Sequence, residues 1–376
     1  MKDKRNEVLA TILLTYSVDL QAGEKIMLEI RGQETLELAK EIIRQATQLG
    51  GVPFWYYNDS SVTRPFIQDA SEAQFEAFGK LHLKLMKECD AWLGLYAPDN
   101  VFEFADVEAD QMTLYTRLYI DLVHVKERVR NTKWCFVTFP TNSKAQLSQM
   151  SQEAYEEFYY DVCCLHYSKM SKAMDPLVEL MERTDRVRIV GPGTDLSFSI
   201  EGLPVVKCDG KENIPDGEVF TAPVRDSLNG HITFNTPALE RGFLFHDIRL
   251  EFESGKVVHA SCQAGTDRLN EILDVDEGAR YIGEFALGLN PFIHRVMNDA
   301  LFDEKIAGSL HLALGQCDRE TPNGNDSAIH WDIVLMQTEE YGGGELYFDG
   351  ELIRRDGKFV DEELEQSLSA EALRAL

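Results

Sequence analysis

Short apolar runs alternate with amphipathic segments along the first half of the chain. Apolar runs occupy residues 25–30, 52–57, 91–97 and 134–139, and segments with helical periodicity occupy residues 35–50, 71–88 and 107–128. Strands that alternate with helices in this way are typical of a mostly parallel sheet with helices on its faces. A further helical stretch over residues 143–184 is expected to end this half of the chain.

From residue 186 onward the pattern changes to short strands separated by turns. Strands are predicted at residues 187–190 and 196–200. Residues 248–253 alternate between apolar and charged side chains before a Ser-Gly turn, which is typical of a hairpin. Asp-Gly pairs at residues 349–350 and 356–357 predict two further tight hairpin turns. Helices are expected near residues 267–273 and at the acidic C-terminus.

These patterns predict two domains, which a chain of 376 residues also favours. Residues 1–185 are expected to form an α/β N-terminal domain with a mostly parallel sheet. Residues 186–376 are expected to form a β-rich α+β C-terminal domain.

The balance of charges excludes some classes of partner. The chain carries 37 basic and 64 acidic residues, which gives a formal net charge of −27. Such a surface repels phosphate backbones and anionic membranes, so we expect no nucleic acid and no membrane as partners. No apolar run approaches the ~20 residues that a membrane-spanning helix needs. The same surface tolerates cations, such as metal ions or a substrate with a free ammonium group.

The cysteines indicate a cytoplasmic protein. There are seven, an odd number, and they are scattered along the chain as Cys89, Cys135, Cys163, Cys164, Cys208, Cys262 and Cys317. No two of them form a CxxC motif, and the adjacent pair at 163–164 suits neither a zinc knuckle nor a simple disulfide. Reduced thiols in a cytoplasmic compartment are the simplest interpretation.

The strongest local candidate for chemistry is the sequence His330-Trp331-Asp332 in a predicted strand. Side chains at positions i and i+2 of a strand lie on the same face, ~6.6 Å apart along the chain. His330 and Asp332 therefore project together, while Trp331 and the flanking Ile329 and Ile333 pack into the core. Two such side chains can bind one metal ion, or contribute to a pair of ions ~3.5–4 Å apart. The alternative is a surface His-Asp pair without a ligand.

A second strand, residues 309–315, repeats this design. His311 lies on the face opposite Leu310 and Leu312, and the small side chains of Ser309 and Ala313 leave room beside its imidazole. The alternative is a core histidine that bonds to a backbone group. Two histidines on nearby strands, each with an uncrowded face, favour a shared site.

Two glutamates in mostly apolar segments extend the set of candidate ligands. Glu218 and Glu284 each follow a glycine, and a buried carboxylate without a partner costs several kcal/mol. A metal ion is one suitable partner, and an ion pair with Arg225 or Arg280 is the alternative. Together with the two histidines and the aspartate, the glutamates form an oxygen and nitrogen ligand set that suits zinc, cobalt or manganese.

Other catalytic motifs are missing from the sequence. There is no HExxH, no GxSxG and no dinucleotide-binding fingerprint. The three glycines at residues 342–344 are not followed by Lys-Ser or Lys-Thr, so a plain loop is favoured over a phosphate-binding loop.

Four stretches of the second half resemble the thermophilic metallo-aminopeptidases of the aminopeptidase T type. They are residues 213–223 (NIPDGEVFTAP), 283–288 (GEFALG), 311–315 (HLALG) and 327–332 (SAIHWD), and they occur in the order in which the family has them. The N-terminal half resembles the family in layout, with less specific motifs.

The resemblance implies a pair of divalent metal ions in the C-terminal domain, which would then be the metal-binding catalytic domain. It also implies the removal of N-terminal residues from peptides, and a homodimer. Position by position, it implies metal-site roles for Glu218, Glu284, His311, His330 and Asp332.

One position departs from the family. The family usually has a tyrosine of the metal site seven residues after the position of His311, and here that residue is Asp318. An aspartate can still offer an oxygen to a metal, but it is shorter, carries a full charge and lacks a phenolic proton. Asp318 is then an altered metal ligand, or Tyr341 compensates for the lost tyrosine, or activity is reduced.

The sequence thus predicts a cytoplasmic, metal-dependent aminopeptidase that acts on peptides with a free N-terminus. Two metal ions would activate a water molecule, and Glu284 would carry its proton to the leaving amine. Two alternatives remain open, a catalytically impaired homologue and a dinuclear metallohydrolase of another class, such as a phosphoesterase.

Overall fold

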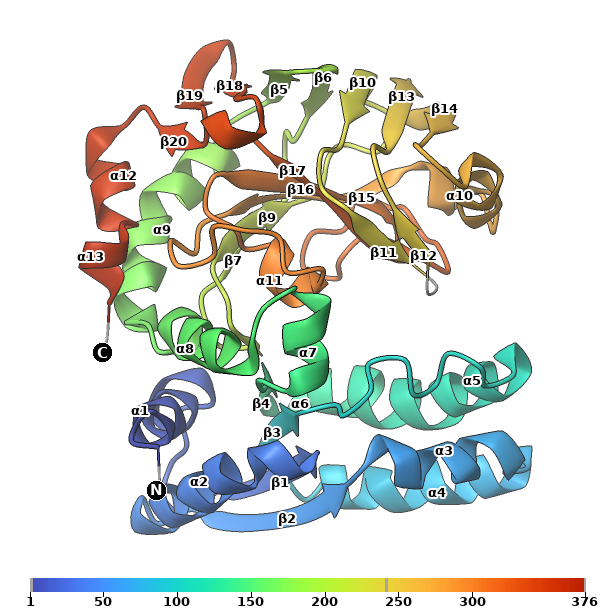
Figure 1. The fold of residues 1–376 in the computed structure, drawn as a ribbon, viewed down its shortest axis with the longest axis vertical. Helices are drawn as coiled ribbons and strands as arrows, with labels where there is room; N and C mark the ends of the chain where they lie inside the picture. The colour runs from blue at the N-terminus through green and yellow to red at the C-terminus, as the bar shows by residue number, and fades with distance from the viewer. Residues whose placement is uncertain (1–2, 241–242, 375–376) are drawn as a thin grey trace. The chain divides into compact units, whose positions relative to one another are not determined.

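The computed structural model describes residues 3–240 and 243–374, which form two compact units (Figure 1). The first unit consists of the described residues up to Leu165 together with Gly210–Pro215. The second unit consists of His166–Asp209 and the described residues from Asp216 onward.

The first unit is built on a five-stranded sheet in the order β2-β1-β3-β4-β8, in which all neighbouring strands are parallel. The strands are β1 (Lys25–Arg31), β2 (Val52–Asn58), β3 (Ala91–Tyr96), β4 (Lys133–Thr138) and β8 (Asn213–Ile214). The helices are α1 (Arg5–Ile12), η1 (Leu13–Ser17), η2 (Gln33–Thr35), α2 (Leu36–Gln48), α3 (Ser60–Asp69), α4 (Glu72–Met86), α5 (Ala109–Tyr115), η3 (Thr116–Arg128), α6 (Val129–Asn131), α7 (Asn142–Leu147) and α8 (Gln152–Cys163).

One face of this sheet is covered by an aromatic core. Met27 of β1 and Trp92 of β3 pack with Phe75 of α4, Tyr115 of α5 and Tyr119 of η3, all of which are buried. The segments α3, α4 and α5, with η3, run side by side along this region (Figure 1). Burial of such large rings is a main source of stability for the unit.

The second unit contains a five-stranded antiparallel sheet in the order β17-β16-β15-β9-β7. Its strands are β7 (Val206–Cys208), β9 (Glu218–Thr221), β15 (Ile282–Gly288), β16 (Ser309–Gly315) and β17 (His330–Met336). Strands β15 and β16 are buried along their whole length. This sheet carries the candidate ligands predicted from the sequence, apart from Asp318.

An eight-stranded antiparallel sheet completes the strands of the core, in the order β14-β13-β10-β6-β5-β18-β19-β20. Its strands are β5 (Arg186–Gly191), β6 (Thr194–Ser199), β10 (Asn229–Thr233), β13 (Arg249–Glu253), β14 (Lys256–Ser261), β18 (Glu345–Phe348), β19 (Glu351–Arg355) and β20 (Lys358–Phe359). A short antiparallel pair, β11 (Ala238–Glu240) and β12 (Phe243–Phe245), follows β10 and precedes β13 in the sequence. The remaining segments are α9 (Tyr167–Glu182), α10 (Thr266–Leu273), η4 (Gly278–Arg280), α11 (Ala300–Asp303), η5 (Glu339–Tyr341), α12 (Glu362–Ser367) and α13 (Ala370–Leu373).

The predicted fold class is confirmed, with an N-terminal α/β part on a parallel sheet and a strand-rich antiparallel C-terminal part. The expected hairpin turns are also present. Ser254-Gly255, Asp349-Gly350 and Asp356-Gly357 all have positive φ at both residues, which a tight hairpin turn of this type requires.

The division of the chain into these two units differs from the predicted domain boundary at residue 185. Helix α9, which that boundary assigns to the first domain, lies in the second unit, because it packs on β7, β9, α12 and α13. The buried face of α9 carries Tyr167, Met170, Met174 and Leu177, at the spacing of an amphipathic helix.

Two observations concern the surroundings in which the chain works. None of the helices within residues 3–240 and 243–374 combines the length and apolar character that a bilayer crossing requires. All seven cysteines lie in the described ranges, and no disulfide joins any of them there.

Candidate metal centre

The register of the five-stranded sheet brings five candidate ligands onto one face. Glu284 of β15 is opposite Ala313 of β16, which in turn is opposite Asp332 of β17. Directly opposed residues of an antiparallel pair project from the same face of a sheet. The small side chain of Ala313 therefore leaves open space between the two carboxylates.

The same reasoning extends to the other candidates. His311 lies two residues before Ala313 on β16, and His330 lies two residues before Asp332 on β17, so both share this face. Glu218, the first residue of β9, is opposite Gly288 of β15, which has the same parity along the strand as Glu284.

The opposite face of this sheet is apolar, which explains why the strands form where they do. Phe285, Leu312 and Ile333 are fully buried, and Phe285 packs edge to face against Phe198 of β6, with ring centroids 5.1 Å apart. The alternation in sequence thus separates a packed face from a polar one, as predicted from residues 309–315 and 328–336.

His311 is the central residue of the cluster, with 1% of its side chain exposed. Its Nε2 lies 3.0 Å from Glu284 Oε1, within hydrogen-bonding distance, and 3.8 Å from Asp332 Oδ1. Its Nδ1 lies 3.9 Å from Glu218 Oε2. One imidazole ring thus lies between carboxylates of three different strands.

His330 is more exposed and is oriented by the backbone. Its Nδ1 is 2.8 Å from the carbonyl oxygen of Gln316, which accepts its hydrogen bond. The bond directs Nε2 toward Asp332 Oδ1 at 3.4 Å and Glu284 Oε2 at 3.8 Å. A histidine that donates one ring N–H to a backbone carbonyl is typical of metal ligands, because the bond fixes the tautomer and the ring orientation.

Carboxylates dominate the electrostatics of the cluster. Burial opposes protonation of both histidines, but the neighbouring carboxylates outweigh it, and the pKa of His311 is raised to about 9 and that of His330 to about 10. Burial raises the pKa of Glu284, with Asp332 and Glu218 adding to the effect and His311 opposing it. Burial also acts to raise the pKa of Asp332, but the charge of His330 lowers it further than burial raises it.

A buried lysine contacts the cluster from the loop before β16. Lys305 has 1% of its side chain exposed, and its Nζ lies 3.1 Å from Glu218 Oε1 and 2.7 Å from Glu304 Oε2. Burial lowers the pKa of the ammonium, but Glu218 and Glu304 raise it by more. Burial raises the pKa of Glu304 to about 8 despite the lysine beside it.

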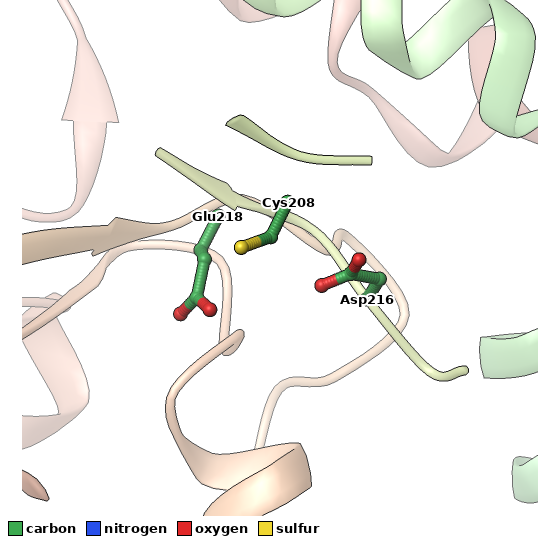
Figure 2. A group of neighbouring side chains, drawn as sticks. All are labelled: Cys208, Asp216 and Glu218. Carbon is green, nitrogen blue, oxygen red and sulfur yellow. The ribbon is translucent and has the colours of Figure 1, made fainter. Parts of the chain in front are cut away.

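A second group of possible ligands adjoins the first at Glu218. Cys208 of β7 is opposite Glu218, and the ligand atoms of Cys208, Asp216 and Glu218 lie within 4.8 Å of one another. Figure 2 shows Cys208 between the two carboxylates. Burial and then the charges of Asp216 and Glu218 raise the pKa of the thiol, so it remains protonated. Lys305 already supplies this group with a cation, since its ammonium is stabilised by Glu218 and Asp216.

Asp318 lies apart from both groups. It is partly buried in the loop between β16 and β17, and its Oδ1 accepts a hydrogen bond from the backbone N–H of Glu320 at 2.6 Å. Within the described ranges, the clusters of three or more His, Cys, Asp or Glu residues with neighbouring ligand atoms do not include Asp318.

The donor atoms of the cluster fit a cation. Glu284, His311 and Asp332 offer ligand atoms within 4.8 Å of one another. Glu218 Oε2, His311 Nδ1 and Asp332 Oδ1 are buried, and none has a hydrogen-bond partner in the described chain. Buried polar atoms without partners are costly, and carboxylate and imidazole are ligands that divalent ions such as zinc prefer. The residues present therefore suit divalent metal ions.

Comparison with known families identifies the chain. A family model described as thermophilic metalloprotease (M29) matches residues 2–359. The chain belongs to this family. The resemblance of the four sequence motifs to enzymes of the aminopeptidase T type is thereby confirmed.

Relatives of this M29 metalloprotease include named aminopeptidases. Aminopeptidase 2 of Geobacillus stearothermophilus is 25% identical over 95% of both proteins. Aminopeptidase T of Thermus thermophilus is 35% identical over 198 residues, which are 45% of this chain and 48% of that protein.

Solved structures confirm the fold of this M29 metalloprotease. Wild-type AmpT from Thermus thermophilus has a TM-score of 0.76 at 22% identity, over 95% of this chain and 99% of that one. A 2,5-dihydroxypyridine dioxygenase from Pseudomonas putida KT2440 has a TM-score of 0.62 at 12% identity, over 97% and 99%. The TM-scores show a common fold, and at such low sequence identities they show nothing more, because a fold by itself does not fix the reaction.

Sequence reasoning does not find the residues that surround the candidate ligands of this M29 metalloprotease. The sequence pattern indicates only a scattered thiol at Cys208, and it does not single out Glu304 or Lys305. A local signal for Lys305 is weak, because an acidic residue beside a lysine is common on exposed loops. Its burial follows from the tertiary fold alone.

Proposed function

We propose that this M29 metalloprotease is an aminopeptidase that hydrolyses N-terminal residues from peptides, with a water molecule activated by two divalent metal ions. The observation that carries the proposal is the cluster of Glu218, Glu284, His311, His330 and Asp332 on one sheet face, with three buried donor atoms that lack partners in the described chain. Membership in a metalloprotease family and the names of the relatives support it.

We assign the ligands to two ions from the separations of the donor atoms. Glu218 Oε2 and His311 Nδ1, 3.9 Å apart, would hold one ion, and His330 Nε2 and Asp332 Oδ1, 3.4 Å apart, would hold the other. Glu284 would serve the second ion through Oε2, which lies 3.8 Å from His330 Nε2, while its Oε1 lies 3.0 Å from Nε2 of His311, on the side of that ring away from Nδ1. The oxygen and nitrogen ligand set suits zinc, cobalt or manganese.

Bound there, divalent ions would supply Lewis acidity, which polarises a carbonyl group and lowers the pKa of water from 15.7 to about 7. The protein would then have to move one proton from the water to the leaving amine. Glu284 is the proposed carrier, because burial raises its pKa and so favours the protonated form that the carrier must adopt in passing. The carboxylate-rich cluster would also attract the free ammonium group of the substrate, which is expected of an exopeptidase.

The proposal has three finer parts. A cytoplasmic location is supported by seven cysteines without a disulfide. A homodimer follows from the family resemblance, and size-exclusion chromatography with light scattering would test it. Metal binding by Asp318 follows from its position in the sequence, although its side chain lies outside the clusters of the described residues.

The test is a panel of aminoacyl p-nitroanilides, assayed with protein of measured metal content before and after chelator treatment. We expect hydrolysis that chelator abolishes and added zinc, cobalt or manganese restores. Glu218→Gln and His330→Ala should lose both metal and activity, while Glu253→Gln, a change of an exposed glutamate on β13, should lose neither. Full metal content and full activity in Glu218→Gln would overturn the assignment.

The same assay separates the rival functions. A phosphoesterase would hydrolyse p-nitrophenyl phosphate and release little p-nitroaniline. An impaired homologue would bind metal weakly or not at all, hydrolyse the aminoacyl substrates weakly, and gain activity strongly on the change Asp318→Tyr.

A further inference from the structure

The first unit contains a cavity of about 180 Å³ between its parallel sheet and η3. Glu29 of β1, Trp92 of β3 and Phe136 of β4 line it from the sheet, and His124 and Arg128 line it from η3. All of these residues belong to the first unit, and none takes part in the candidate metal centre.

The arginine in this cavity is fixed in position by aromatic rings. The guanidinium carbon of Arg128 lies 4.5 Å from the ring centroid of Trp92 and 4.0 Å from that of Trp134. Cation–π contacts with two rings hold the side chain rigidly. The indole of Trp92 in turn lies over Gly94, where a Cβ atom would be only 2.1 Å from the ring. The glycine therefore makes the room that this arrangement needs.

Several hydrogen-bond donors around the cavity lack acceptors. Nε and Nη1 of Arg128 and Nε1 of Trp92 are buried, and none has a hydrogen-bond partner in the described chain. Trp92 is only 3% exposed, so solvent does not satisfy its N–H group. Glu29 Oε2, from the lining of the same cavity, is a buried acceptor that also has no hydrogen-bond partner in the described chain. Native proteins rarely leave buried polar groups unsatisfied, so the three donors indicate an acceptor bound in the cavity, and the carboxylate oxygen indicates a water molecule beside it.

The charges around the cavity leave one cation in excess. Glu29 pairs with Arg31, whose Nε lies 2.6 Å from Glu29 Oε1. Burial lowers the pKa of His124 to about 4, so this ring is neutral at physiological pH. Burial lowers the pKa of Arg128 to about 10, with Glu29 and Glu212 opposing, so the guanidinium is still protonated. Within the described ranges no carboxylate forms an ion pair with it.

We propose that this cavity binds a small organic carboxylate, whose negative charge meets Arg128 and whose apolar body packs on Leu95, Ile120 and Phe136. The excess charge selects a monoanion, and the unsatisfied N–H groups select an oxygen acceptor. A cavity of about 150 Å³ holds benzene, so this one suits a body of about six carbons. The site is independent of the proposed peptidase chemistry, and it would give the first unit a ligand of its own.

Benzoate is the probe, with the neutral isostere benzamide as its control. Full-length, chelator-treated protein is titrated with each by calorimetry, so that no metal ion can bind the carboxylate. We expect saturable binding of one benzoate per chain, and at least tenfold weaker binding of benzamide. Equal affinity for the two probes, or no saturable benzoate binding because water fills the cavity, overturns the proposal.

Three variants locate the site. Arg128→Met removes the charge at similar volume and should weaken benzoate binding at least tenfold, while Arg130→Met changes an exposed arginine of the same segment and should leave it unchanged. Ile120→Trp fills the cavity and retains Arg128, so it should also abolish benzoate binding. It provides the test if Arg128→Met proves unstable. Benzoate binding that persists in either cavity variant overturns the proposal.

Discussion

Replacement of Lys305 by methionine tests whether the candidate metal centre depends on a buried cation of its own. Methionine fills a similar volume but removes the ammonium group that contacts Glu218 and Glu304. The variant leaves the buried carboxylate of Glu218 without the ammonium group beside it, and Glu304 loses the same partner. We expect a large loss of stability in metal-free protein, because such charges are costly away from water.

The structure sets the size of this loss. At the observed separation of 3.1 Å, and with an effective dielectric constant of about 20, the contact with Glu218 contributes roughly 5 kcal/mol of Coulomb attraction. The desolvation of the three groups offsets most of this, and removal of one partner from a buried pair costs about 3–5 kcal/mol. Glu304 can take up a proton, since its pKa is already raised to about 8, and this relief favours the lower end of the range.

Urea unfolding of chelator-treated protein measures the loss. The double variant Lys305→Met/Glu304→Gln should recover part of it, because it removes a carboxyl group that would otherwise lose its ammonium partner. Zinc should recover a further part, since an ion at Glu218 replaces the missing positive charge. Lys256→Met, a change of an exposed lysine on β14, is the control and should have little effect. An unchanged unfolding free energy in Lys305→Met would refute the reasoning.

Three further outcomes follow from the same sheet. Metal-free protein should lose stability as pH rises, because the pKa values of His311 (about 9) and His330 (about 10) in the folded protein lie above the unfolded value of ~6.5. The protonated histidines contribute stability that is complete below pH ~6.5 and disappears through pH 9–10. Urea unfolding at pH 6 and pH 10 checks this, and a flat profile would contradict it. Leu312→Ala on the apolar face should cost about 2–5 kcal/mol of unfolding free energy, and a cost well under 1 kcal/mol would show that the core collapses around the gap. Asp276→Asn should lower zinc affinity measured by calorimetry. Asp276 accepts a hydrogen bond from the backbone N–H of Ala328 at 2.6 Å and so fixes the position of the chain just before β17. Unchanged affinity would rule out this role.

The fold was predictable where the local pattern agrees with the tertiary structure. The predicted strand at residues 91–97 and helix at 71–88 appear as β3 and α4, since each has a strong period and α4 begins with a capping box at Ser71. Helix α3 was not predicted, because it contains Pro65 and the β-branched residues Val62 and Thr63, which have low helix propensity. Tertiary packing determines its conformation.

The candidate site was predictable as a set of side chains but not as an arrangement. Alternation along β16 and β17 predicts which face His311 and Asp332 occupy, and the structure has them there. Sequence alone does not give the register that aligns Glu284 with Asp332 across Ala313, because register depends on how neighbouring strands pair. The same limit applies to Lys305, which reaches Glu218 over 87 residues of chain.

The charges of the cluster explain how such a site can exist in a folded protein without metal. Three buried carboxylates, from Glu218, Glu284 and Asp332, would repel one another strongly if they stood alone. Lys305 compensates one, and the protons on His311 and His330 compensate the other two, because these residues are cationic at neutral pH.

If the two histidines bind divalent ions as proposed, the ions compete with protons for them, so uptake of metal by the metal-free protein should release protons and strengthen as pH rises. Asp318 stands outside this balance. It is partly exposed, and its Oδ1 accepts a hydrogen bond from the backbone N–H of Glu320. An aspartate at a position where the family usually has tyrosine is thus compatible with a stable fold, and any cost of the exchange falls on metal binding or on activity.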